Sequence, residues 1–197
     1  MNLKKFLIII LLFNINYDVA YSIQPDVFVQ STVNRASQIL SENLTKIEKI
    51  NKLKIIAKET VDIKAVGYYS LGSARKNLNE TQKQKYSKLF EAYFLKSFSS
   101  RLAEYTNPEI QVNGKEVLNK NYTIVNSVLI ATSERPEVKI DWRIYTKNPE
   151  NPLIRDLIIE GLSLARTQKE EFNSVLQSND NDINVLFETL KKFVNES

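Results

Sequence analysis

A corner over residues 156–172, where a strand turns at a glycine directly into a helix, constrains the fold of this chain most strongly. Residues 157–159 are apolar and mostly β-branched, which is typical of a buried strand. Gly161 then permits a sharp change of direction because it has no side chain. Ser163 can cap the helix that follows, whose first turns are rich in strong helix formers. We therefore expect a sheet and a helix to meet here, with the preceding segments supplying a cavity that the corner closes.

The first residues have the pattern of a secretory signal peptide. Lysines precede the apolar run 6–13, and Ala20 and Ser22 place small residues at the two positions that a signal peptidase reads. The apolar run is far shorter than the roughly 20 residues that a membrane anchor needs. We expect residues 1–22 to be removed as a signal peptide on export, which leaves residues 23–197 as a single domain.

Two absent residue types exclude large classes of function. The chain has no cysteine, so an exported form cannot rely on disulfides and cannot be a lipid-anchored lipoprotein. It has no histidine, which removes the commonest general base and the commonest metal ligand. A formal net charge of +4 is too small to indicate nucleic-acid binding. We expect no metal, no other cofactor and no nucleic-acid partner.

Apolar residues at helical spacing predict the helices. They are expected over residues 26–46, 46–60, 63–71, 80–105, 163–177 and 182–194. The first two follow one another without a sharp breaker. Asp62 is a suitable N-cap for the third helix, and Asn79 with Gln82 has the spacing of a capping box for the fourth.

The fourth of these helices carries an unusually aromatic stripe. Its apolar positions, which fall on one helical face, are Tyr86, Leu89, Phe90, Tyr93, Phe94, Phe98, Leu102 and Tyr105. These rings can simply fill a core against the sheet. They can equally form the wall of a pocket for an apolar ligand, since flat rings leave slots that branched aliphatic side chains would fill. The residues alone leave both interpretations open.

After Pro108 the period of the apolar residues changes to two, which indicates an antiparallel sheet. The expected strands cover residues 110–118, 122–132, 138–145 and 153–160. The overall prediction is an α+β fold in which a curved antiparallel sheet of about four strands packs against several helices. A gap between the layers would suit acyl chains. Its expected lining is Val128, Ile140, Trp142, Leu157 and Ile159 from the sheet, with Phe94 and Phe98 from the aromatic helix.

The chain gives no clear signal of catalysis. Residues 161–163 lack the second glycine of a nucleophile elbow, and there is no histidine to activate the serine. Asp141, Asp156 and Glu160 belong to no spaced ligand motif, so each is interpreted as a solvated side chain. We expect a binding protein and not an enzyme. Two other classes stay open: an enzyme that acts on an apolar molecule through a buried carboxylate, and an interaction module with a dry core.

Four blocks of the sequence match the pattern of a known family. The two most specific are the strand 140–143, Ile-Asp-Trp-Arg, and the corner 156–172 with its Asp-x-x-x-Glu-Gly-Leu-Ser pattern. The block 61–72 matches as well, and so does the aromatic helix with its Tyr93-Phe94 pair and its ending 101–105. In these places the chain resembles the MlaC-type phospholipid-binding proteins, the toluene-tolerance auxiliary family of Gram-negative periplasms. The resemblance implies a mixed α+β domain that holds a phospholipid tail-first between sheet and helices, with the headgroup in water.

The resemblance also implies a function and a site. It implies a soluble, monomeric periplasmic carrier that shuttles phospholipid between an outer-membrane lipoprotein complex and the substrate-capturing subunit of an inner-membrane ABC transporter, which maintains outer-membrane lipid asymmetry. A hopanoid or another apolar molecule is the alternative cargo. Phe98 and Leu162 resemble pocket-wall residues of the family, although a tyrosine is common at the first position. The full set of candidate lipid-binding residues is Tyr69, Phe94, Phe98, Val128, Ile140, Trp142, Leu157, Ile159 and Leu162.

Overall fold

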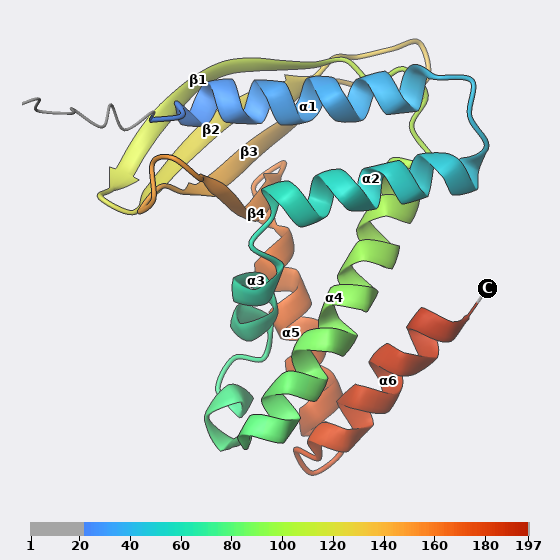
Figure 1. Ribbon diagram of the computed structural model, residues 1–197, viewed down its shortest axis with the longest axis vertical. Helices are drawn as coiled ribbons and strands as arrows, with labels where there is room; N and C mark the ends of the chain where they lie inside the picture. The colour runs from blue at the N-terminus through green and yellow to red at the C-terminus, as the bar shows by residue number, and fades with distance from the viewer. Residues whose placement is uncertain (1–21, 197) are drawn as a thin grey trace, which may run out of the picture.

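The computed structural model describes residues 22–196, which form a helical part next to a sheet that one helix covers (Figure 1). The described residues contain six α-helices and an open antiparallel sheet, which confirms the predicted α+β class. Apart from its last residue, the predicted signal peptide lies outside the described residues. None of the described helices is both long enough and apolar enough to span a bilayer.

The six α-helices follow the predicted order along the chain, and a short 3-10 helix that was not predicted lies between the third and the fourth. They are α1 (Pro25–Ser41), α2 (Lys46–Thr60), α3 (Ile63–Ser70), the short 3-10 helix η1 (Ala74–Asn77), α4 (Glu80–Leu102), α5 (Leu164–Gln177) and α6 (Ile183–Asn195). In Figure 1, α1 lies along the sheet, α2 runs beneath it, and α4 descends from α2 toward the helical part. The sheet and the helical part meet at β4, which contacts α3 and α5.

The sheet is a meander in which each strand pairs with the next. Its strands are β1 (Ile110–Asn119), β2 (Tyr122–Leu129), β3 (Val138–Tyr145), β4 (Leu153–Ile159) and β5 (Leu162–Ser163), in the order β1-β2-β3-β4-β5. Trp142 in β3 pairs with Val125 of β2 and with Leu157 of β4. The register slips between Val112 and Gly114, the place where Asn-Gly predicts an irregular strand. The fifth strand is only two residues long and was not expected.

Two hydrophobic cores, not one, hold the domain together. In the first, which we call the sheet core, Val29 and Val33 of α1 pack on one face of the sheet against Val125 and Ile144. The second, the helical core, joins α2, α3, α4, α5 and α6 around side chains such as Phe90. The apolar face of the sheet therefore packs against α1 and not, as expected from the sequence, mainly against the aromatic helix.

The two cores are joined at the segment between α2 and α3. Val61 packs against both cores and forms an isolated parallel bridge with Ile154 of β4. The Asp62 backbone N–H donates to the Ile154 carbonyl over 2.9 Å, and the Asp62 carboxylate accepts from the Ala65 N–H over 3.1 Å, as predicted for the N-cap of α3. Val61 and Asp62 thus start α3 of the helical core and also bind β4 of the sheet core.

Capping side chains explain where the helices begin. Asn79 and Gln82 form the predicted capping box of α4. The prediction of one helix from residue 26 to 46 was wrong at its end, because α1 stops at Ser41 and a short loop follows. Thr45 and Glu48 form a second capping box there and start α2. This signal was present in the sequence as Thr-x-x-Glu, but the continuous apolar spacing hid it.

Candidate functional site

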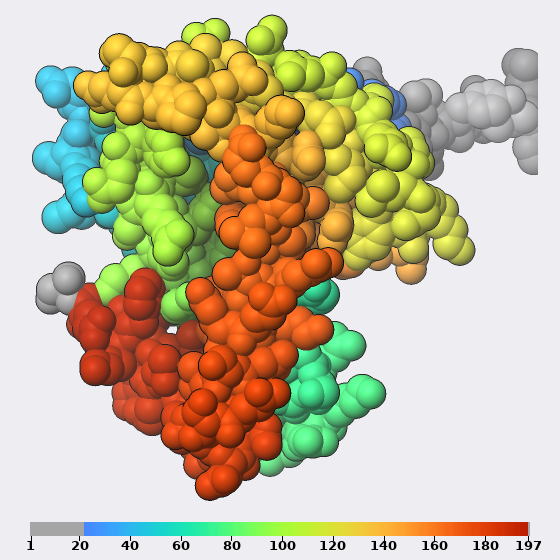
Figure 2. All heavy atoms as spheres, turned by 180° about the vertical axis from the view of Figure 1, so that it is seen from behind, coloured from blue at the N-terminus to red at the C-terminus, as the bar shows by residue number. Residues whose placement is uncertain are grey.

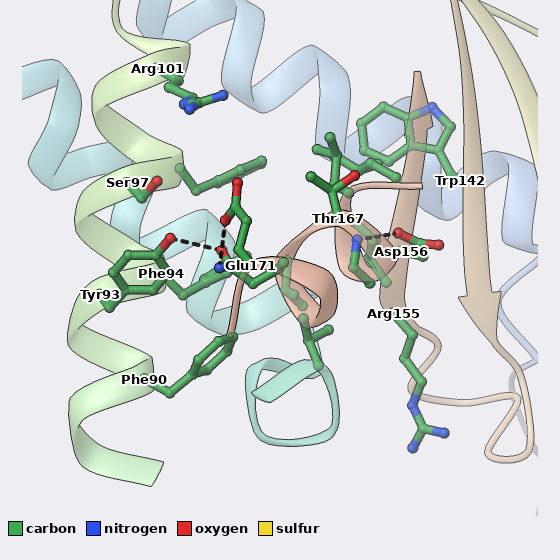
Figure 3. Close-up of a pocket in the computed structure, with 18 residues that line it drawn as sticks. Phe90, Tyr93, Phe94, Ser97, Arg101, Trp142, Arg155, Asp156, Thr167 and Glu171 are labelled. Carbon is green, nitrogen blue, oxygen red and sulfur yellow. Dashed lines mark hydrogen bonds between the residues drawn. The ribbon is translucent and has the colours of Figure 1, made fainter. Parts of the chain in front are cut away.

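A cavity of about 190 Å³ lies where the two cores meet, between α4 on one side and β4 with α5 on the other (Figure 3). We call it the aromatic cavity. Its apolar lining consists of Val61, Val66, Phe90, Phe94, Phe98, Trp142, Ile154, Leu157, Leu164 and Ala165. Its polar or partly polar lining consists of Tyr93, Ser97, Arg101, Arg155, Asp156, Thr167, Gln168 and Glu171.

Stacked phenylalanines of α4 form one wall of the aromatic cavity. The ring centroids of Phe90 and Phe94 are 6.2 Å apart, and those of Phe94 and Phe98 are 5.4 Å apart with an interplanar angle of 11°. Four-residue spacing places these side chains one above another on the helix surface. Phe90 is buried, whereas Phe94 and Phe98 are only partly buried. The wall is thus a ladder of rings that is anchored at one end and accessible at the other.

The opposite wall comes from the sheet and is fixed by hydrogen bonds. The Trp142 indole N–H donates to the Ser127 hydroxyl over 2.8 Å, and that hydroxyl donates to the Ile140 carbonyl over 3.0 Å. The polar atom of the indole is therefore satisfied away from the cavity, and its apolar ring surface is left for the lining. Ile154 and Leu157 continue this wall along β4.

Asp156 fixes the corner between β4 and α5. It was interpreted as a solvated side chain, but its residue is only 6% exposed. Its carboxylate accepts from the Ser163 hydroxyl over 2.6 Å and from the Ala165 backbone N–H over 3.0 Å, and Arg143 lies 3.6 Å away. Both oxygens are thus used to hold the first turn of α5. Within residues 22–196, no group of three or more acidic side chains lies close enough together to hold a metal ion.

Polar side chains of α4 and α5 form a rim around the aromatic cavity. The Tyr93 hydroxyl donates to Gln168 Oε1 over 2.7 Å, and Gln168 Nε2 donates to Glu171 over 2.9 Å. Burial, reinforced by the nearby Glu171 carboxylate, raises the pKa of the Tyr93 hydroxyl, so it stays protonated and can donate. Arg101 adds a positive charge at the end of α4 on this rim (Figure 3).

The structure brings together four of the nine candidate lipid-binding residues. Phe94, Phe98, Trp142 and Leu157 all line the aromatic cavity. Tyr69 is 40% exposed and borders a second cavity. The remaining four candidates, which do not border the aromatic cavity, are Val128, Ile140, Ile159 and Leu162.

The four candidates outside the lining have separate physical reasons for their positions. Ile140 is buried in the sheet core under α1. Val128 and Ile159 are half-buried elsewhere in the sheet. Leu162 lies at the tip of the corner and is 59% exposed, because Glu160 and Gly161 both adopt positive φ and turn the chain outward there.

Several lining residues were not among the candidates. Phe90 and Tyr93 belong to the aromatic stripe, so the helical spacing could have included them. Val61 and Val66 lie in the block that matched the family pattern, but they sit on short segments without a period that assigns a face. Ala165 lines the cavity because Asp156 holds the first turn of α5 at this position, and the apolar spacing cannot predict this contact across the corner.

An aromatic cavity between two cores, with a polar rim, is the kind of concave and mostly apolar site at which proteins bind small molecules. The profile of the MlaC protein family matches residues 30–192, so the chain belongs to the MlaC family. This confirms the resemblance found in the sequence.

A solved structure with a similar fold comes from Ralstonia solanacearum. It is described as a phospholipid-binding protein in complex with a phospholipid, determined at 1.53 Å resolution. The two chains superpose with a TM-score of 0.73 at 17% sequence identity, over 87% of this chain and 97% of the other. At this identity the likeness supports the fold and not the ligand. Among curated proteins, none matches the sequence significantly.

Proposed function

We propose that this protein is a periplasmic phospholipid carrier that shields acyl chains in the aromatic cavity while it moves between membranes. The observation that carries the proposal is the ladder of partly buried phenylalanines that faces Trp142 and Leu157 across a cavity. Large aromatic rings that remain accessible inside a folded domain need an apolar partner to leave water, and an acyl chain supplies one.

The energy of acyl-chain burial is large enough to hold a lipid. Each buried methylene contributes about 0.8 kcal/mol, so roughly ten methylenes correspond to about micromolar binding. The aromatic cavity, at about 190 Å³, is smaller than the roughly 300–1,000 Å³ of pockets for drug-sized ligands. Two full acyl chains therefore require α4 and α5 to move apart from the sheet wall. Such movement is feasible because the cavity lies between the two cores and not inside either one.

The proposed location and partners follow from family membership and from the predicted signal peptide. A carrier in the periplasm would receive a phospholipid at one membrane and release it at the other. The proposed partners are an outer-membrane lipoprotein complex and the substrate-capturing subunit of an inner-membrane ABC transporter, and the proposed result is maintenance of outer-membrane lipid asymmetry. In this proposal Asp156 has a structural role at the cavity, since both of its carboxylate oxygens hold the first turn of α5.

The first test is native mass spectrometry of the purified mature protein, followed by solvent extraction of bound lipid. We expect a diacyl phospholipid at close to one per chain. Phe98→Glu should remove most of this lipid, because a carboxylate in the acyl-chain site must be desolvated against apolar surface. Ile55→Glu, at a position on α2 that is 57% exposed, is the matched control and should keep its lipid.

Leu162→Glu tests whether the lipid site is the lining of the aromatic cavity alone or also includes the corner. If the lining of the aromatic cavity defines the site, this exposed position should tolerate the charge and the protein should keep its lipid. Loss of lipid in this variant would instead extend the site to the corner, as the family resemblance implies. A wild-type protein that carries no lipid and takes up none from vesicles would refute the carrier proposal and favour an interaction module.

A further inference from the structure

A second cavity, of about 490 Å³, lies on the other side of the connection between β4 and α5. Figure 2 shows β4 and α5 as a column down the back of the molecule, with α4 and α6 on one side and α3 on the other. The second cavity is bordered by α3, η1, the β1–β2 turn and the neighbouring parts of β3 and β4. We call it the arginine cavity, because Arg75, Arg143 and Arg155 all line it.

Arg155 is held rigidly at the wall of the arginine cavity. Its Nε and NH2 groups donate to one Asp62 carboxylate oxygen over 2.9 and 2.8 Å, and its NH1 donates to the Tyr122 hydroxyl over 2.7 Å. Its guanidinium carbon lies 3.5 Å from the centroid of the Tyr145 ring. Figure 3 shows this guanidinium pointing away from the aromatic cavity. The guanidinium has five N–H donors, so part of its fork remains for another acceptor.

The other two arginines are less constrained. The Arg143 side chain is 41% exposed, and its contact to Asp156 is long at 3.6 Å because the oxygens of Asp156 accept shorter hydrogen bonds from α5. Arg75 is exposed and forms no ion pair with any residue in the range 22–196. Three guanidinium groups thus face two carboxylates, those of Asp62 and Asp156, and one positive charge remains unmatched.

Apolar groups surround these charges, as an amphiphile would require. Tyr69 and Leu118 border the arginine cavity and are 40% and 47% exposed. Val66, Arg155, Asp156 and Ala165 line both cavities, so these residues form the wall between the two. A molecule with a charged head and an apolar tail can occupy both cavities only if Val66, which is buried, moves aside.

We infer that the arginine cavity is a subsite for the phosphate group of an amphiphile whose acyl chains occupy the aromatic cavity. The inference rests on the proposed function and makes it more specific, because it gives the headgroup a binding site instead of leaving it in water. Guanidinium groups match phosphate oxygens in geometry and charge, and such charge-assisted bonds are stronger than neutral ones. The same groups would bind a free phosphate ester, so the test must distinguish the phosphate of a lipid from the phosphate of a small water-soluble molecule.

The test compares two short lipids with the same tails. Dioctanoyl phosphatidic acid has a phosphate, and dioctanoylglycerol has none. Trp142 lines the aromatic cavity and is the only tryptophan of the chain, so its fluorescence reports occupancy by either lipid. We expect the wild-type protein to bind the phosphatidic acid about tenfold more tightly, a ratio that one or two charge-assisted hydrogen bonds produce. A third titration uses sn-glycerol 3-phosphate alone.

Arg75→Ala is the decisive variant, because an exposed arginine without an ion pair can be removed without unfolding the protein. It should lower the preference for phosphatidic acid to about threefold or less and leave binding of dioctanoylglycerol unchanged. Arg143→Lys keeps the charge beside Asp156 and should also lower the preference, since lysine lacks the planar fork. Arg166→Ala, an exposed arginine of α5 that borders neither cavity, is the matched control and should change nothing.

Each result decides between the two proposals. Equal affinity of the wild-type protein for both lipids would overturn the phosphate subsite and keep the carrier. A preference that depends on Arg101, at the rim of the aromatic cavity, and not on Arg75 would also overturn it. Binding of glycerol 3-phosphate that depends on Arg75, without binding of either lipid, would support the phosphate site but refute the carrier. Absence of all binding would refute both.

Discussion

Replacement of Gly67 by alanine should destabilise the protein, although alanine is the better helix former. Gly67 lies in α3, where this substitution alone would stabilise the helix by about 1 kcal/mol. A Cβ atom at Gly67 would lie 2.6 Å from Cδ1 of Phe90 and 3.0 Å from its Cγ. The Tyr86 hydroxyl donates to the Gly67 carbonyl over 2.9 Å, which holds α3 close to α4 at this point.

Phe90 cannot move away easily to relieve this clash. Its ring has centroid distances of 5.7 Å to Tyr86, 6.2 Å to Phe94 and 6.2 Å to Phe172. Overpacking of such a core costs about 1–3 kcal/mol, and we take the upper part of this range because the ring is only 2% exposed. After the gain in helix propensity, the net loss should be about 1–2 kcal/mol, or roughly 2–8 °C in Tm. Any displacement of Phe90 would also narrow the aromatic cavity.

Urea denaturation followed by circular dichroism measures this loss. Gly114→Ala is the matched control, because a Cβ there meets no atom within 4 Å, and its stability should change by less than about 0.5 kcal/mol. In the double variant with Phe90→Leu the clash should largely disappear, so the two changes should not be additive. Stabilisation by Gly67→Ala of about 1 kcal/mol would refute the reasoning and show that helix propensity wins over packing.

Three further predictions concern stability. Asp156→Asn should lower the free energy of unfolding by about 1–3 kcal/mol in urea denaturation, because an amide has only one acceptor oxygen for the Ser163 hydroxyl and the Ala165 N–H. The matched change Asp141→Asn, at a partly buried position that accepts one hydrogen bond, should cost less. Thr45→Ala should lower stability by about 1 kcal/mol through loss of the N-cap of α2, and no change would show that the loop before α2 is held by other contacts. Burial raises the pKa of Tyr86 and of Tyr93 above the ordinary value of 10.0. Above about pH 10 these hydroxyls ionise in the unfolded chain while they stay protonated in the folded protein, so the folded state loses stability as the pH rises further. Unfolding free energies between pH 8 and 11 should therefore fall, and Tyr93→Phe should make the fall less steep.

Local signals in the sequence predicted the elements well, because side chains such as Asp62 and Ser163 act on the backbone a few residues away. Both cap the helices that they were expected to cap. The strand at Val138–Tyr145 was predicted to the residue, since its alternation is regular. The break after α1 was missed because its capping box follows an apolar pattern that runs on without interruption.

The site was only partly predictable, because alternation shows which residues share a face but not which element covers that face. Phe94 and Trp142 were chosen for their faces and do meet across the aromatic cavity. Ile140 shares a face with Trp142, but α1 covers it. The arginine cavity was not visible in the sequence at all. Arg75, Arg143 and Arg155 come from three separate elements, and only the register of β3 with β4 and the position of η1 bring them together.

The presence of two cores joined along a cavity has a consequence for the cooperativity of unfolding. A domain unfolds in a single all-or-none step when its parts pack extensively against one another. Here the aromatic cavity takes the place of part of the packing between the helical core and the sheet core. A ligand that touches Phe90 of the helical core and Trp142 of the sheet core stabilises both by mass action. Without lipid, the helical core and the sheet core would then unfold at different temperatures. In calorimetry the single heat-absorption peak of the lipid-bound protein would divide into two.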